Sequence, residues 1–415
     1  TIVTLRRVAF LLGIIGMLAL LLFRYPICQL TFGNTDHVDA LALLSVIIFF
    51  TEVSGGQAAL IQGLRHIGDL ARLNILGALL GTLFSIPLVY FWGEPGIAPF
   101  LVVTAAAGTL TSWYYARRIS IPQIKVPWKE ITAESRGLLR LGLAFMASGL
   151  MSLGAMYFVR VVIVRQLGLD AAGLFQAASA IATLYVGFIL SAMGADFYPR
   201  LTAVANDDAA CNRMVNEQAE ISLLLAVPGV LATLTFAPFV IRIFYAASFA
   251  PAIDILRWQV LGAFLRVASW PLGYILLAQG RGKIFLCTEF SYNAVQIGLV
   301  LVLLHYFGLP GTGMAFFGVN LFSLLLIFAV VRRLSGFSWS ASNIRVAALT
   351  VPGVTTVFLA VYFLPGILST AAGGAMTLAL GCYCAYTLRS AVGPDKIQEI
   401  FQRWRYKIHL PGQRS

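Results

Sequence analysis

The chain has 415 residues, of which 59% are hydrophobic and 11% are charged, and its net charge is +12. A soluble domain is about 45–50% apolar and about 25% charged, so this composition excludes a soluble enzyme and a disordered chain. Twelve membrane helices of about 20 residues would take about 240 residues, which is close to the hydrophobic fraction. We therefore expect an all-α polytopic membrane protein. The positive charge, which would suggest nucleic acid on a soluble protein, indicates membrane topology here.

Apolar runs, cut at charged or Gly/Pro-rich breaks, predict twelve spans in chain order. They cover residues 8–24, 39–62, 75–92, 96–116, 138–164, 171–195, 218–244, 252–278, 284–307, 312–331, 345–364 and 368–388. Of the 29 Lys and Arg residues, 23 fall in one alternate set of loops and the C-terminal tail. This bias predicts that these loops and the C-terminus are cytoplasmic. Residues 394–409 read as a short amphipathic helix on the cytoplasmic membrane surface.

An internal repeat is visible in four pairs of short segments. Segments 27–32, 61–63, 91–98 and 114–119 correspond to 240–245, 278–280, 306–313 and 329–334, at offsets of 213, 217, 215 and 215. The first four spans therefore pair with spans seven to ten in the same orientation, as in parallel-repeat transporters. Spans five and six have no partner within the chain, so the repeat predicts two further helices before residue 1.

The repeat divides the chain into predicted domains. We expect a first bundle with four of six helices, a cytoplasmic linker, a complete six-helix second bundle, two accessory membrane helices and an amphipathic cytoplasmic tail. Their predicted ranges are 1–120, 121–136, 137–334, 335–390 and 391–415.

No catalytic motif is present in the sequence. Residues 308–313 hold three glycines, but no Gly-Lys-Ser/Thr follows, so they are not a P-loop. We expect no enzyme activity, metal site or cofactor, and transport that is uncoupled or driven by the substrate gradient or a proton or sodium gradient. The five cysteines are expected to be buried free thiols; Cys382 and Cys384 form a CxC without a nearby His.

Two ionisable residues near the middle of predicted spans are the main site candidates. Arg266 shares a helix face with Ser269, Trp270 and Gly273, and Glu52 lies at a nearly equivalent position in the other half of the repeat. Because such groups are costly in hydrocarbon and usually face a cavity, we expect Arg266 to bind an anionic group. Glu52 would pair with it or titrate. The alternative is a static salt bridge that holds the two bundles together.

Other ionisable residues leave more than one interpretation open. Arg257 lies nine residues before Arg266, on the opposite helix face at 100° per residue, and is expected to pair with Asp254 or to extend to the interface. Arg160 either lines the cavity or extends to the interface. Glu289 could pair laterally with Asn293, and Asp196 either gates the cytoplasmic side or contacts a helix end. The substrate-binding candidates are Arg266, Glu52, Arg160, Trp270 and Arg257; the gating or coupling candidates are Asp196 and Glu289.

Three segments carry a resemblance to a known family. RVVIVRQLGLDAAGLFQA at 160–177, MGADFYPRLTAV at 193–204 and LIQGLRHIGDLARLN at 60–74 resemble O-antigen-type flippases of the multidrug/oligosaccharidyl-lipid/polysaccharide (MOP, MATE-like) superfamily. The resemblance covers essentially the whole chain. Arg160 matches an arginine of that family, whereas Val159 stands where an Asp often precedes it, so the resemblance does not carry a paired-charge role to this position.

The resemblance implies two pseudo-symmetric bundles around a central V-shaped cavity that works by alternating access. The implied cargo is an undecaprenyl-pyrophosphate-linked oligosaccharide, such as an O-antigen, enterobacterial common antigen or exopolysaccharide repeat unit. It would move from the cytoplasmic to the periplasmic leaflet of the bacterial inner membrane. Implied partners are membrane lipids and possible polysaccharide polymerase and chain-length regulators. The alternatives are a cation-coupled multidrug exporter of the same superfamily and a transport-inactive scaffold for polysaccharide assembly.

Overall fold

The computed structural model describes residues 2–64, 66–118, 128–364 and 366–392. Twelve α-helices and two short 3₁₀ helices fill these ranges, and each α-helix is long and apolar enough to cross a membrane. The α-helices are α1 (Ile2–Phe32), α2 (Val38–Gly63), α3 (Ile67–Trp92), α4 (Ile97–Arg117), α5 (Trp128–Leu167), α6 (Leu169–Ala203), α7 (Asp208–Phe244), α8 (Ala252–Ala278), α9 (Gly282–Phe307), α10 (Pro310–Ser335), α11 (Ala341–Phe363) and α12 (Gly366–Val392). The 3₁₀ helices are η1 (Glu94–Gly96) and η2 (Ala247–Phe249). The predicted all-α architecture with twelve spans is confirmed.

Several helices extend beyond their predicted spans. α5 begins at Trp128 and α7 at Asp208, about ten residues before the predicted starts, and α6 continues to Ala203. The prediction was too short because hydropathy marks only the part of a helix that lies in hydrocarbon, whereas a helix continues until its backbone is capped. α7 shows this directly, since the side chain of Asp207 accepts a hydrogen bond from the backbone N–H of Ala210 at 3.0 Å.

The chain separates into two compact units, residues 1–146 and 147–415. In the first unit α1 packs on α2, α2 packs on α4, and α3 packs on α4. In the second unit α7 packs on α8, α8 on α10, and α9 on α10. The packing of four helices is thus repeated six helices later, as the sequence repeat predicts.

Two pairs of glycines show the repeat at the level of single residues. Gly93 and Gly308 end α3 and α9 with φ of 59° and 63°, a left-handed conformation that glycine adopts at little cost. Three residues later, Gly96 and Gly311 lie against a carbonyl oxygen of the preceding helix, so that a Cβ atom at either position would overlap it. The same sharp turn between neighbouring helices is therefore built twice.

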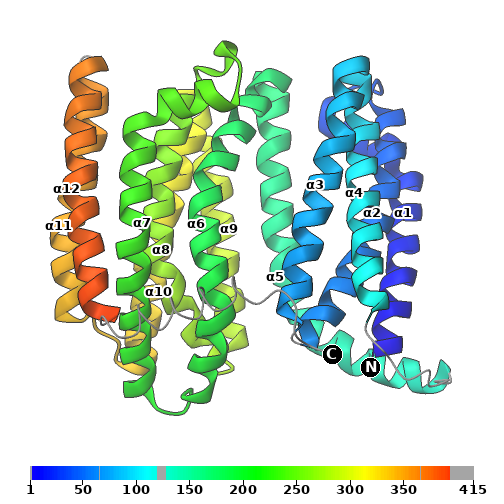
Figure 1. The fold of residues 1–415 in the computed structure, drawn as a ribbon, viewed down its shortest axis with the longest axis horizontal. Coiled ribbons are helices and arrows are strands. Elements are labelled where there is room, and N and C mark those ends of the chain that lie inside the picture. Colours follow the sequence, from blue (N-terminus) through cyan, green and yellow to red (C-terminus); the bar gives the residue numbers. More distant parts are fainter. Residues whose placement is uncertain (1, 65, 119–127, 365, 393–415) are drawn as a thin grey trace, which may run out of the picture. The chain divides into compact units, whose positions relative to one another are not determined.

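The accessory helices α11 and α12 pack on each other and on α7 in the second unit (Figure 1). The connection from α10 to α11 is tied to α7 by polar side chains. Asn216 Oδ1 accepts hydrogen bonds from the backbone N–H of Ser340 at 2.8 Å and from Asn343 Nδ2 at 2.9 Å. Asn212 Nδ2 donates to the carbonyl of Ser335 at 2.7 Å. The two accessory helices are thereby fixed to one helix of the second unit.

Two predicted features lie outside the described residues. They are the amphipathic tail helix at 394–409 and residues 121–127 of the predicted linker. Residues 128–136 of that linker form the beginning of α5.

Candidate functional site

A cavity of about 450 Å³ lies inside the second unit, between α5, α6, α8, α9 and α10. A membrane helix seldom carries polar side chains unless they face a cavity or another helix, and here they converge from all five helices. The polar lining residues are Ser152, Ser179, Thr183, Gln259, Arg266, Ser269, Tyr274, Thr288, Glu289, Tyr292, Asn293, Gln296, Asn320 and Ser323. This polar cavity is the candidate site.

Arg266 supplies a positive charge to the cavity from the middle of α8. Its side chain is exposed, and among the described residues it forms no side-chain hydrogen bond or ion pair. Ser269, Trp270 and Gly273 line the same cavity, as their helical spacing predicts. A guanidinium in this setting keeps its N–H donors available to a bound anion.

Glu289 supplies the negative charge, from α9. Its carboxylate interacts with the Ser152 hydroxyl of α5 through a side-chain hydrogen bond and lies within range of the Arg266 charge. The lateral pairing with Asn293 differs from the prediction, because Asn293 Nδ2 donates to the backbone carbonyl of Glu289 at 2.8 Å and not to the carboxylate. The carboxylate is therefore directed to the cavity and α5.

A cluster of three aromatic rings lies next to Arg266, towards the C-terminal end of α8. The rings of Trp270 and Tyr274 meet edge to face with centroids 4.5 Å apart, and the ring of Tyr198 from α6 lies 5.4 Å from that of Tyr274. Trp270 and Tyr274 line the cavity between Arg266 and the end of α8 at Ala278. Aromatic faces of this kind offer apolar area with a polar edge, which suits a sugar ring.

Amide side chains complete the walls, and the sequence reasoning missed most of them. Gln259 Nε2 donates to Ser179 Oγ at 2.9 Å and joins α8 to α6, while Tyr292 and Asn320 interact through a side-chain hydrogen bond that joins α9 to α10. Gln259 and Asn320 are buried, with 3% and 1% of their surface exposed. Buried amides inside apolar spans are a signal that the sequence carried, because such groups need partners in a membrane.

The remaining predicted residues lie elsewhere. Arg257 does not line the cavity; it forms an ion pair with Asp254 at 3.5 Å, as expected, and its guanidinium lies 5.7 Å from the ring centroid of Tyr362. Arg160 is also absent from the lining, and its Nη2 donates to Gln176 Oε1 at 2.8 Å across the α5–α6 hairpin.

The last two candidates belong to other parts of the chain. Glu52 is exposed on α2 of the first unit. Asp196 belongs to α6, but its side chain lies outside the described part of the structure.

Metal ligands do not gather in the described part of the chain, where no group of three or more His, Cys, Asp or Glu side chains could hold an ion. The five cysteines are free. Cys28, Cys211 and Cys384 are buried as expected, whereas Cys287 and Cys382 are exposed. The two exposed thiols lie on α9 and α12, in segments apolar enough to cross a membrane, so that a position in a span does not by itself imply burial within the protein.

The fold is that of MOP-superfamily transporters. The inward closed structure of the lipid II flippase MurJ aligns with a TM-score of 0.69 at 13% identity, over 93% of this chain and 84% of that chain. An inward-facing multidrug resistance MATE family transporter of the MOP superfamily aligns with a TM-score of 0.67 at 19% identity, over 80% of this chain and 79% of that chain.

Sequence comparison gives the family. Residues 2–254 match the family described as polysaccharide biosynthesis protein, and the chain belongs to that family. The lipid III flippase of Escherichia coli (strain K12) is 26% identical over 311 residues, which cover 72% of this chain and 71% of the relative. The lipid III flippase of Shigella flexneri matches to the same extent. The resemblance carried by the sequence motifs is confirmed.

Proposed function

We propose that this protein is a flippase that moves undecaprenyl-pyrophosphate-linked oligosaccharides from the cytoplasmic to the periplasmic leaflet of the bacterial inner membrane. The observation that supports it most is the exposed guanidinium of Arg266 in a polar cavity within a membrane bundle. The polysaccharide biosynthesis family and the similarity to lipid III flippases support the same class of cargo.

The chemistry of the cavity matches the parts of such a cargo. A guanidinium binds phosphate oxygens through two parallel N–H donors, and Arg266 has no competing ion pair in the described residues. Sugar hydroxyls both donate and accept hydrogen bonds, and the amides and hydroxyls of Gln296, Asn293 and Ser323 can do the same. Trp270 and Tyr274 offer ring surface to a sugar face. Arg266 would therefore hold the pyrophosphate, with polar and aromatic groups around the sugars.

The test is translocation by the purified protein in liposomes. Undecaprenyl-pyrophosphate-linked oligosaccharide is placed in one leaflet, and its arrival in the other is followed for the wild type and for Arg266→Gln. We expect the variant to be at least tenfold slower, since a charge-assisted hydrogen bond contributes about 1.5–3 kcal/mol. Arg213→Gln, an exposed position on α7 outside the cavity, is the control and should transport normally.

Two outcomes would replace this proposal. Transport of a cationic dye without transport of the lipid-linked sugar would indicate a multidrug exporter, and no transport of either by correctly folded protein would indicate an assembly scaffold. Complementation of a strain that lacks its lipid III flippase, with defined O-antigen, common-antigen or exopolysaccharide repeat units, would identify the oligosaccharide. In the same strain, collapse of the proton or sodium gradient tests whether transport is coupled to that gradient. Co-purification tests whether this protein associates with a polymerase or a chain-length regulator.

A further inference from the structure

One end of the first unit is strongly basic. α1 and α3 begin there and α2 and α4 end there, because the four helices are joined by short turns and pack side by side. Among residues 2–7, 60–64, 66–73 and 113–118, which form these helix ends, Asp69 is the one acidic residue. The arginines at these helix ends are Arg6, Arg7, Arg72, Arg117 and Arg118.

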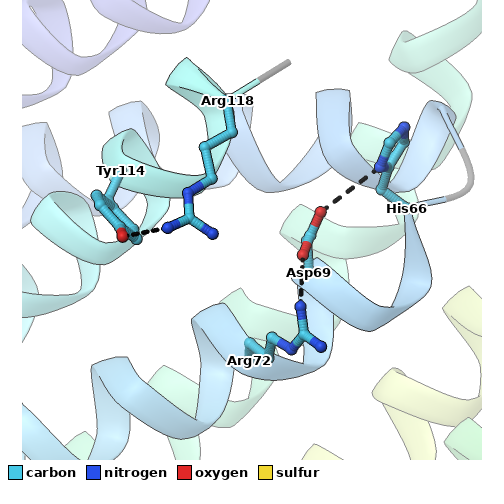
Figure 2. A network of polar contacts seen from close by, with 5 residues as sticks. All are labelled: His66, Asp69, Arg72, Tyr114 and Arg118. Atoms are coloured by element: carbon cyan, nitrogen blue, oxygen red, sulfur yellow. Dashed lines mark hydrogen bonds and ion pairs between the residues drawn. The ribbon is translucent and has the colours of Figure 1, made fainter. Parts of the chain in front are cut away.

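The carboxylate of Asp69 already contacts two side chains close to it in the sequence. His66 Nδ1 lies 3.5 Å from one carboxylate oxygen of Asp69, and Arg72 Nη1 lies 3.3 Å from the other. Figure 2 draws both contacts. The two carboxylate oxygens therefore lie near basic side chains three residues before and three residues after Asp69. This carboxylate does not neutralise the arginines at the end of α4.

Arg117 and Arg118 rest on aromatic rings instead of carboxylates. The Arg117 guanidinium lies 5.3 Å from the ring centroid of Trp113, and that of Arg118 lies 4.3 Å from the ring centroid of Tyr114. Arg118 Nη2 also donates to the Tyr114 hydroxyl (Figure 2). Neither arginine has an ion pair within the described part of the chain. Stacking occupies a face of the planar guanidinium and leaves most of its N–H donors free at the edge.

Packing holds this end of α4 in place. Tyr115 and Ala116 are buried against Ile61 of α2 and Leu73 of α3. Trp113 and Tyr114 are about half exposed, at 47% and 50%, which is typical of aromatic residues at a membrane–water interface. Two oriented guanidinium groups, neither with an ion pair in the described residues, thus lie at the end of a helix that is long and apolar enough to cross a membrane.

We propose that Arg117 and Arg118 form a binding site for the phosphate of an anionic phospholipid such as phosphatidylglycerol. A phosphodiester matches the free guanidinium edges, which can bind two oxygens in parallel. The C-terminal end of α4 also stabilises the two positive charges, because the free carbonyl groups of its last turn carry partial negative charge. The site is separate from the cavity of the second unit and does not depend on the proposed cargo.

The experiment measures lipid binding to the full chain by native mass spectrometry and by titration in nanodiscs. We expect Arg117→Gln/Arg118→Gln to bind phosphatidylglycerol about twenty-five times more weakly than the wild type, at roughly a factor of five for each charge near a lipid surface, with phosphatidylcholine binding unchanged. Arg281→Gln/Lys283→Gln removes the same charge from exposed residues of the second unit and should bind normally. Equal weakening in both double variants, or in neither, would overturn the site.

Two further measurements distinguish a phospholipid site from a cargo site and from a simple effect of positive charge. Undecaprenyl pyrophosphate in phosphatidylcholine nanodiscs should bind to Arg117→Gln/Arg118→Gln as tightly as to the wild type. If this variant loses that binding but still binds phosphatidylglycerol, the two arginines bind the cargo and the proposal is refuted. Arg117→Lys/Arg118→Lys keeps the charge and the fold but loses the planar guanidinium. It should bind phosphatidylglycerol with an intermediate affinity, and wild-type affinity would contradict the role of the stacked arginines.

Discussion

Arg266 on α8 and Glu289 on α9 line the same cavity and interact electrostatically, yet no ion pair joins them within the described residues. The carboxylate is hydrogen-bonded to Ser152 on α5. A closed ion pair would satisfy both charges and leave little for a ligand. The open arrangement keeps the guanidinium available while a nearby negative charge limits how tightly it binds an anion.

Glu289→Gln is therefore expected to tighten binding of undecaprenyl pyrophosphate about fivefold. The reason is that repulsion between the carboxylate and the phosphates is removed, which at the dielectric of a partly solvated site is of the order of 1 kcal/mol. Titration of the lipid in nanodiscs measures it. Glu217→Gln, the same change at an exposed position of α7, should leave the affinity unaltered, and an equal gain in both variants would show a general charge effect.

Arg257 and Arg266 lie on the same helix and should respond in opposite ways. Arg266→Met should reduce transport at least tenfold with little change in stability. Arg257→Met should keep transport within about twofold, because that side chain is 14% exposed, pairs with Asp254 and does not line the cavity. Transport in liposomes and the thermal unfolding midpoint are measured for both. A loss of transport in a stable Arg257→Met protein would return Arg257 to the list of cargo-binding residues.

Gly96→Ala and Gly311→Ala should each destabilise the protein, by about 1–3 kcal/mol, since a Cβ at either position would overlap a backbone carbonyl oxygen that cannot move aside. Unfolding in detergent, followed by temperature or denaturant, gives the free energies. Gly298→Ala is the control, because no atom lies within 4 Å of a Cβ built there and it is inside α9. That variant should be as stable as the wild type or slightly more stable.

Asn216→Ala should loosen the attachment of α11 and α12. The change removes the side-chain acceptor of Ser340 N and the hydrogen bond from Asn216 Nδ2 to the carbonyl of Ser338. Asn343 Nδ2 keeps the backbone carbonyl of residue 216 and Ser340 Oγ as acceptors, so we expect a cost of about 0.5–1.5 kcal/mol for each lost hydrogen bond. We expect a lower unfolding midpoint and faster proteolysis between residues 336 and 340. Arg213→Ala, a neighbouring exposed position on α7, should show neither effect; unchanged proteolysis in Asn216→Ala would contradict the attachment.

The spans, their pairing and the face of Arg266 could be predicted because each depends on spacing along the chain. Ser269 and Trp270 share the cavity with Arg266 as the helical period requires. The other walls could not be predicted, since the faces that converge from α5, α6, α9 and α10 depend on interhelical packing. Arg257 illustrates both cases. Its orientation away from Arg266 could be predicted, because the two residues are nine positions apart on one helix. Its contact with the ring of Tyr362 could not be predicted, because that contact depends on where α11 packs.

The packing of α5 bears on the size of the cargo that the cavity can accept. About 450 Å³ is enough for a small-molecule ligand, whereas an oligosaccharide on a pyrophosphate needs one wall to move. In the described residues of the second unit, α8 and α10 pack closely along their length, while α5 has no close helix partner and meets the others mainly through side chains such as Val159 and Ile163. Movement of α5 therefore breaks fewer close backbone contacts than movement of α8 or α10, although it still separates buried side chains. Among the five helices around the cavity, α5 is thus the one held least closely by neighbouring backbone, and we expect it to be the wall that moves for a large sugar.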